Sequence, residues 1–233
     1  NKKINSFETD SRVSSFDQEL LKKLAGFNDM YFPSPEFKYK LERGEIKDSY
    51  MSDKENKFLK IYDELIKKYD IKLSQSKNKS FLDKWFVKNV REEIDFAFSL
   101  VKKVKDVKNK KAVALILSRT IRSCRATMHS DLATLKEPQL TTYYCFKHKK
   151  ICKPLLSIKS WFDRYAVDTI NRLEIFSRLK KHVYSSAIPA DSRVVDIFKE
   201  VEKRNIKFYQ LLKKQKIKGI FTSPPYVGQI DYH

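Results

Sequence analysis

Apolar residues recur at intervals of three and four along several stretches of this chain, which is the spacing of one face of a helix. Between Lys54 and Tyr69 this repeat is unbroken, and it predicts an amphipathic helix. The apolar face of that helix consists of Phe58, Ile61, Tyr62, Leu65, Ile66 and Tyr69. A polar linker at 72–80 follows, and the same periodicity resumes beyond it.

The central part of the chain predicts further helices that together form a bundle. A second helix, or a pair of short ones, is indicated by Leu82, Trp85, Phe86, Val90, Ile94, Phe98, Val101 and Val104. The polar run 109–111 should end it, and 112–123 is apolar enough to be a buried helix. Another amphipathic helix is expected over 158–180, and its inward residues should be Trp161, Tyr165, Ile170, Leu173 and Phe176.

The two ends of the chain depart from this period. Residues 1–50 combine polar stretches with two prolines among aromatic residues, which predicts an irregular arm laid over the core. Near the other end, 182–193 has the alternation of a strand, 194–214 has helical spacing, and 218–226 is a short apolar strand that runs into a loop. This order predicts a βαβ unit of a parallel sheet. Because such a unit cannot cover its own sheet, we expect other polypeptide to complete it.

The fold class expected from these patterns is mostly α. A helical domain over residues 1–180 should be followed by a partial α/β segment over 181–233. Within the helical domain, 124–158 lacks clear secondary-structure signals and is expected to be irregular.

The net charge of the chain indicates the kind of partner that it binds. The chain carries 49 Lys and Arg against 29 Asp and Glu, a formal net charge of +20, which exceeds what solubility requires and suits a polyanion. The alternative source of the excess is a lysine-rich proteome of an AT-rich or heat-adapted organism. No run approaches the roughly 20 apolar residues of a membrane-spanning helix, and the first residues contain no apolar signal core. We therefore expect a soluble, cytoplasmic protein of a prokaryote without a membrane partner.

All three cysteines fall within 124–152, together with two of the four histidines. An odd number of clustered cysteines argues against a secreted disulfide framework and for reduced thiols. Zinc prefers four soft or borderline ligands, and two ligands separated by two residues are its usual first half. The preferred ligand set is Cys124, Cys145, His148 and Cys152, with His129 as the alternative to Cys124. Such a closed site would order the irregular region and do no chemistry; the other interpretation is that these cysteines are ordinary packing residues.

The most specific short motif is Ser223-Pro224-Pro225-Tyr226, which follows an apolar run. It resembles the catalytic motif of the DNA methyltransferases that modify the exocyclic amine of cytosine or adenine. By this resemblance, the Ser223 hydroxyl and the Pro224 carbonyl accept hydrogen bonds from the target amine, and Tyr226 stacks on a base flipped out of the duplex. In this family a serine at the first position accompanies N4-cytosine more often than N6-adenine methylation. The alternative is that the two prolines only end a strand at a turn.

The same resemblance implies S-adenosylmethionine as the cofactor and a Rossmann-like sheet, of which 181–233 is one part. Asp191, at the tip of the first predicted strand, would lie near the adenine of the cofactor, or would cap the following helix, or both. The glycine-rich loop that binds the cofactor's methionyl group in this family is missing, because the four glycines are too far apart. The helical domain resembles the insertion that some of these enzymes place before the catalytic motif. We therefore expect part of a restriction-modification methyltransferase, inactive without the cofactor-loop segment and the strands after the motif.

Basic residues around the cysteine segment predict contacts with DNA phosphates. They are Arg119, Arg122, Arg125, Lys147, Lys149 and Lys150. Tyr143, Tyr144 and Phe146 beside them offer stacking surfaces, and the plain alternative is a solvated basic face. Two classes of function stay open at this point. One is part of a DNA amino-methyltransferase, and the other is a non-enzymatic, basic, helical nucleic-acid-binding module.

Overall fold

A computed structural model of the protein describes residues 11–47, 49–75, 80–129, 137–181, 183–215 and 219–221. Over these ranges the chain is mostly helical, as expected, and holds a two-stranded antiparallel sheet. The chain divides into two compact units, Asn1–Asn171 and Arg172–His233. Among the described helices, none has both the length and the apolar character needed to cross a membrane.

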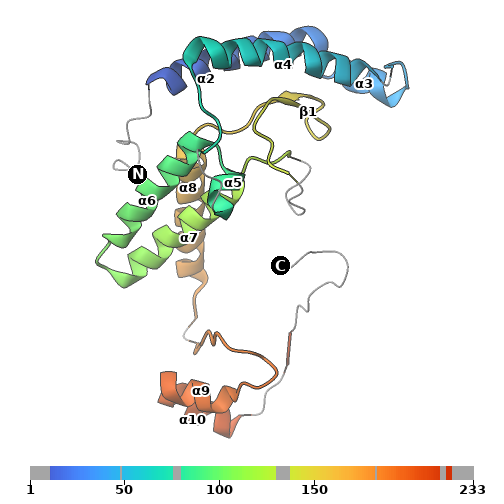
Figure 1. Cartoon of the computed structure of the whole chain (residues 1–233). Helices are drawn as coiled ribbons and strands as arrows, with labels where there is room; N and C mark the ends of the chain where they lie inside the picture. The colour runs from blue at the N-terminus through green and yellow to red at the C-terminus, as the bar shows by residue number, and fades with distance from the viewer. Residues whose placement is uncertain are drawn as a thin grey trace. The chain divides into compact units, whose positions relative to one another are not determined.

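Two long helices, α2 (Ser11–Tyr31) and α4 (Ser49–Tyr69), lie side by side in the first unit (Figure 1). The predicted helix over 54–69 is thus confirmed. The prediction of an irregular arm over 1–50 is wrong in the described part, because α2 is a regular helix and α3 (Glu36–Glu42) follows the prolines. A helical spacing was present in the sequence, since the buried face of α2 includes Phe16, Leu20, Leu24 and Phe27.

Four more helices are described after the linker: α5 (Phe81–Trp85), α6 (Lys88–Lys102), α7 (Val107–Ser123) and α8 (Lys159–Leu179), the last of which runs on into the second unit. The predicted pair of helices after the linker and the predicted helix over 158–180 are confirmed. The break between α6 and α7 lies earlier than predicted, before Val107 and not at 109–111. Its cause is Asp106, whose carboxylate accepts a hydrogen bond from the backbone N–H of Asn109 at 2.7 Å and caps α7.

A single hydrophobic core joins α2, α4, α6, α7 and the first half of α8. Its fully buried side chains include Phe16, Phe58, Tyr62, Phe86, Val90 and Ile158. The aromatic rings of Phe27 and Phe58 meet edge to face across the α2–α4 contact, with their centroids 4.9 Å apart. The core therefore gives the first unit a rigid base for the segment between α7 and α8.

Buried polar side chains attach the segment 151–158 to this core. The amide of Asn28 on α2 donates to the carbonyl of Ile151 at 3.0 Å and accepts from its N–H at 2.9 Å. The carboxylate of Glu93 on α6 accepts from the N–H of Ile158 at 2.6 Å, just before α8 begins. These bonds satisfy backbone groups that are buried in β2 and just before α8.

The prediction of the inward face of α8 is wrong for its outer half, the part after Thr169. Trp161 and Tyr165 are partly buried and pack on the core, as predicted. Ile170, Leu173 and Phe176 were also predicted to point inward, but each is more than half exposed. A helical period in the sequence shows which residues share a face, and only the fold decides how far along the helix that face is covered.

The second unit contains α9 (Ile197–Arg204) and α10 (Ile206–Lys214) in place of the single helix predicted over 194–214. They part at Asn205, whose extended backbone ends α9 and whose side chain accepts from the N–H of Phe208 at 3.0 Å to cap α10. Val201 is the buried residue of α9.

The parallel sheet predicted for this region is not confirmed. Residues 183–193 form no strand, and neither do 219–221, the described part of the second predicted strand. A parallel strand receives its backbone hydrogen bonds only from neighbouring strands of the same sheet. Without such neighbours, the strand-like alternation of this sequence does not produce a strand.

Candidate metal centre and nucleic-acid interface

The predicted catalytic residues Ser223, Pro224, Pro225 and Tyr226 lie outside the described residues, so their roles stay predictions. Asp191 is described. Its carboxylate accepts hydrogen bonds from the backbone N–H of Arg193 at 3.0 Å and from its guanidinium at 2.6 Å. The guanidinium of Arg193 in this way lowers the pKa of Asp191 below its ordinary value.

The helix after Asp191 begins at Ile197, and its N-cap is Asp196, which accepts from the N–H of Lys199 at 3.0 Å. The suggestion that Asp191 caps this helix is therefore wrong. Its role at the cofactor stays a prediction.

The cysteine segment, expected to be irregular, contains the hairpin of β1 (Tyr143–Cys145) and β2 (Lys150–Cys152). The two strands pair antiparallel with Cys145 opposite Lys150. The turn between them is tight, because the N–H of Lys149 donates to the carbonyl of Cys145 at 2.7 Å and Lys149 adopts a left-handed backbone with φ of 55°. His148 is placed by this turn next to both cysteines of the hairpin.

Four potential metal ligands converge at the hairpin: His129, Cys145, His148 and Cys152, whose ligand atoms all lie within 4.8 Å of one another. The Nδ1 atom of His148 is 3.4 Å from the sulfur of Cys152, and Nδ1 of His129 is 3.7 Å from the sulfur of Cys145. The backbone N–H of His148 also donates to the sulfur of Cys145 at 3.4 Å. The structure thus joins three of the four predicted ligands with His129.

Cys124, the fourth residue of the preferred ligand set, does not belong to this group. It ends α7, is 2% exposed, and packs in the main hydrophobic core. Burial raises the pKa of its thiol to about 12. Cys124 therefore lies outside the group, and His129, the alternative that the sequence left open, takes its place, because the end of α7 directs Cys124 into the core.

The environment of His129, His148 and Cys152 favours their uncharged forms as long as no cation lies between them. Burial raises the pKa of the Cys152 thiol to about 12, and Cys145 beside it adds to the effect. Burial also lowers the pKa of both His129 and His148, and the ammonium group of Lys147 acts in the same direction. Neutral imidazoles keep a lone pair, and a lone pair is what a metal requires of histidine.

The hydroxyl of Tyr143 contacts both the ring and the backbone of His129. It lies 2.9 Å from Nδ1 of His129 and accepts a hydrogen bond from the His129 backbone N–H at 3.1 Å. The two histidine rings lie beside each other with their centroids 4.5 Å apart. Sequence reasoning missed this contact because 14 residues separate Tyr143 from His129, and only the fold brings them together.

The basic residues predicted to contact DNA fall into two structural groups. Arg119 binds within the fold: its guanidinium donates to the carboxylate of Asp168 at 2.7 Å and stacks on the ring of Tyr165. It therefore links α7 to α8, which is a structural task. Lys147, Lys149 and Lys150 surround the hairpin turn, where Lys147 and Lys150 are exposed together with the aromatic ring of Phe146.

Arg122 and Arg125 follow one another at the end of α7. Arg122 is exposed, and Nε of Arg125 donates to the backbone carbonyl of Arg122 at 3.2 Å. Among the six predicted residues, Arg122, Lys147 and Lys150 are the exposed ones, and contact with a phosphate backbone requires exposure. Contact of these residues with DNA stays a prediction.

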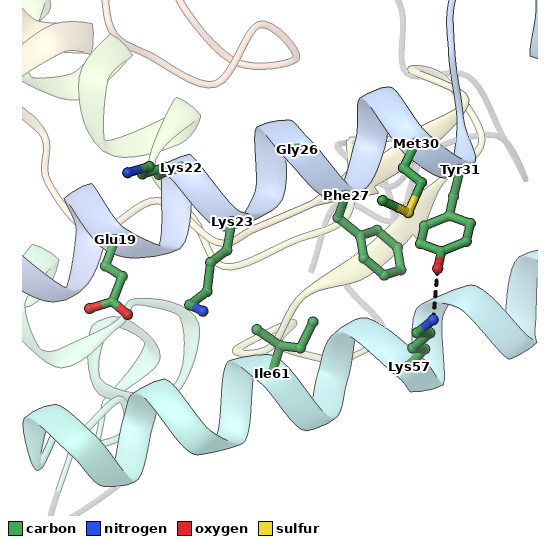
Figure 2. A pocket seen from close by; sticks show the side chains of 9 residues that line it. All are labelled: Glu19, Lys22, Lys23, Gly26, Phe27, Met30, Tyr31, Lys57 and Ile61. Carbon is green, nitrogen blue, oxygen red and sulfur yellow. Dashed lines mark hydrogen bonds between the residues drawn. The ribbon is translucent and has the colours of Figure 1, made fainter.

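A further basic surface, which the sequence did not indicate, is the groove between α2 and α4 (Figure 2). Its volume is about 580 Å³. The residues that line it are Glu19, Lys22, Lys23, Gly26, Phe27, Met30, Tyr31, Lys57 and Ile61. Nζ of Lys57 donates to the hydroxyl of Tyr31 at 2.7 Å, and this lowers the pKa of Tyr31. Figure 2 shows Lys23 reaching from α2 toward α4 across this open groove.

Comparison with known proteins relates nearly the whole chain to one of them. The chain is similar to the Type II methyltransferase M.MjaII of Methanocaldococcus jannaschii, with 44% identity over 236 residues and 99% of the chain aligned. The chain spans 44% of the length of that protein. No family model matches the chain, and no solved structure matches it. The similarity confirms the resemblance to the DNA methyltransferase family, without distinguishing its N4-cytosine and N6-adenine members.

Proposed function

We propose that this chain is part of an S-adenosylmethionine-dependent DNA methyltransferase that modifies an exocyclic amine, N4 of cytosine in preference to N6 of adenine. The observation that carries the proposal is the 44% identity to a Type II methyltransferase along 99% of the chain. The Ser-Pro-Pro-Tyr motif supports it as well, since it resembles the catalytic motif of the amino-group DNA methyltransferases. We expect such an enzyme to act in the cytoplasm as one component of restriction-modification.

The proposed chemistry assigns a task to each residue of the motif. An exocyclic amine is a poor nucleophile, because its lone pair is delocalised into the ring. The Ser223 hydroxyl and the Pro224 carbonyl accept hydrogen bonds from the amine and hold its nitrogen in the reacting geometry. Pro225 fixes the backbone of the loop, and Tyr226 stacks on the flipped base. Bound S-adenosylmethionine supplies an electrophilic methyl group.

Asp191 fits the adenosine end of that cofactor. It lies at the edge of a surface depression of about 410 Å³, whose lining combines apolar side chains with carboxylates. The lining residues are Pro189, Ala190, Asp191, Val194, Val195, Asp196, Lys199, Glu200 and Lys203. Apolar groups can cover an adenine ring, and a carboxylate can accept hydrogen bonds from ribose hydroxyls. The methionyl end needs a glycine-rich loop, and the remainder of the enzyme supplies that loop.

The proposal is tested on the intact protein that contains this sequence. It is incubated with DNA and methyl-labelled S-adenosylmethionine, the DNA is digested to nucleosides, and the labelled base is identified. We expect label on N4-methylcytosine, a loss of at least about 100-fold in rate for Ser223→Ala, and DNA binding close to that of the unmodified protein. Ser177→Ala, an exposed serine on α8 whose hydroxyl bonds only locally to the Glu174 carbonyl, is the matched control.

Each outcome of this experiment separates the two classes of function. Label on N6-methyladenine keeps the enzyme and corrects the base. If a folded protein that binds the cofactor labels no DNA, the proposal is wrong and the chain belongs to a nucleic-acid-binding module. Equal rates for Ser223→Ala and Ser177→Ala would mean that the motif has no role in the reaction and that its prolines only form a turn.

A further inference from the structure

We propose that His129, Cys145, His148 and Cys152 bind one zinc ion in a closed, tetrahedral, structural site. The four residues come from separate places along the chain: the loop after α7, the end of β1, the hairpin turn and the end of β2. The proposal goes beyond methyl transfer and does not depend on it. It is also independent of the residues assigned to the reaction, which lie elsewhere in the sequence.

The distances between the ligand atoms already approach those of a zinc site. Bond lengths of about 2.3 Å to sulfur and about 2.0 Å to nitrogen place the ligand atoms of a tetrahedral site roughly 3.3–3.8 Å apart. The His148–Cys152 distance of 3.4 Å and the His129–Cys145 distance of 3.7 Å fall in this range. The largest separation in the group is at most 4.8 Å, so binding requires a contraction of no more than about 1 Å.

The backbone of the hairpin supplies a hydrogen-bond donor to the sulfur of Cys145. The N–H of His148 points at the Cys145 sulfur from 3.4 Å, and a hydrogen bond to a charged acceptor is stronger than one to a neutral acceptor. The left-handed backbone of Lys149 closes the turn so that His148 faces the strands. One turn therefore places Cys145, the backbone N–H that donates to its sulfur, and the side chain of His148.

The chemistry of the ligand set selects zinc. Two thiolates neutralise the two charges of the ion, so the partly buried site carries no net charge when it is filled. Sulfur and imidazole ligands without a carboxylate suit zinc and disfavour magnesium and calcium, which prefer oxygen. Four protein ligands complete the coordination shell, so the ion has a structural role and no position for a reacting water.

One face of the hairpin packs on the main core through Tyr144 and Ile151. On the other face, Tyr143, Cys145 and Cys152 form a small hydrophobic cluster of their own, separate from the main core. A cluster of three residues buries too little apolar surface to order the hairpin turn and the loop that brings in His129. Zinc would join these segments and fix the turn that exposes Phe146 and Lys147.

The experiment is metal analysis of the intact protein after purification without chelator. We expect about one zinc per chain, and a cobalt-substituted protein whose absorption shows tetrahedral geometry with two thiolate ligands. Cys145→Ser and His129→Ala should each lose the metal, whereas Cys124→Ala should keep it. His129→Cys keeps a fourth ligand, so it should retain the metal and show a third thiolate in the cobalt spectrum.

The outcomes distinguish the proposal from its competitors. A folded protein without zinc that also fails to bind added cobalt overturns the site. Loss of metal in Cys124→Ala together with full retention in His129→Ala overturns the ligand set and restores Cys124. If Cys145→Ser does not fold, the cobalt spectrum of the unmodified protein and of His129→Cys still counts the thiolates. Zinc content is measured without any methylation assay, so a failure here leaves the proposed function untouched.

Discussion

Replacement of Asn28 by alanine tests how the hairpin is attached to the helical core. Asn28 lies on α2, is 8% exposed, and its amide forms both hydrogen bonds to the backbone of Ile151, which is 1% exposed. Asn28→Ala removes one donor and one acceptor and leaves a buried N–H and a buried C=O without partners. An unpaired buried group costs about 1–3 kcal/mol, so the free energy of unfolding should fall by about 2–5 kcal/mol. A water that enters the gap would bring the value toward the lower end.

Urea unfolding followed by tryptophan fluorescence measures this loss, since both tryptophans, Trp85 and Trp161, lie in the first unit. With a slope of about 1–3 kcal/mol per molar urea, the midpoint should shift by at least about 0.7 M. Asp29→Ala is the matched control, because Asp29 is the exposed neighbour of Asn28 in α2 and gains the same helix propensity on replacement. The control should stay within about 0.5 kcal/mol of the unmodified protein.

Asn28→Asp sharpens the test. Aspartate can still accept from the N–H of Ile151, but its carboxylate cannot donate to the Ile151 carbonyl until it is protonated. The variant should therefore be destabilised at neutral pH, and its deficit should narrow as the pH falls. If Asn28→Ala and Asp29→Ala unfold at the same urea concentration, the two hydrogen bonds do not hold the hairpin and the reasoning fails.

Two further substitutions test other polar contacts of the first unit. Glu93→Ala removes the acceptor for the buried N–H of Ile158 and should lower the free energy of unfolding by about 3 kcal/mol; Glu92→Ala, exposed on the same helix, is its control in the same urea assay. Glu19→Gln tests a pH effect, because the hydrogen bond from Lys68 lowers the pKa of Glu19. The stability from Glu19 is present above the ordinary glutamate pKa and is lost as the pH falls through the lowered one. The melting temperatures of variant and unmodified protein should thus differ at neutral pH and converge in acid; a constant difference would contradict this.

The sequence by itself predicted the helical class, the helices corresponding to α4, α6, α7 and α8, and the general place of the metal ligands. These features depend on local periodicity and short spacing, which are visible without a fold. Helix α2 has the same periodicity, with apolar spacing from Phe16 to Phe27. The prolines on which the prediction of an irregular arm depended lie after the end of this helix.

Only the tertiary structure decided whether Cys124 or His129 lies beside Cys145, His148 and Cys152. Both residues lie near the end of α7, and their distance from Cys145 along the chain does not separate them. The fold does so, because the last turn of α7 places Cys124 in the main core while the following loop carries His129 to the hairpin. The bonds of Asn28 to Ile151 are equally invisible in the sequence, where the two residues are 123 positions apart.

The two strands predicted between 182 and 226 also depended on contacts that a local sequence pattern does not reveal. Alternation marks a sequence that can be a strand, but a parallel strand forms only when neighbours supply its hydrogen bonds. The apolar residues on the outer half of α8 likewise share a face that the described chain does not cover. Local sequence therefore determined which segments are helical and which residue types can bind metal or act on a base. Burial, pairing and ligand choice were decided by the tertiary structure, because each depends on residues that meet only when the chain folds.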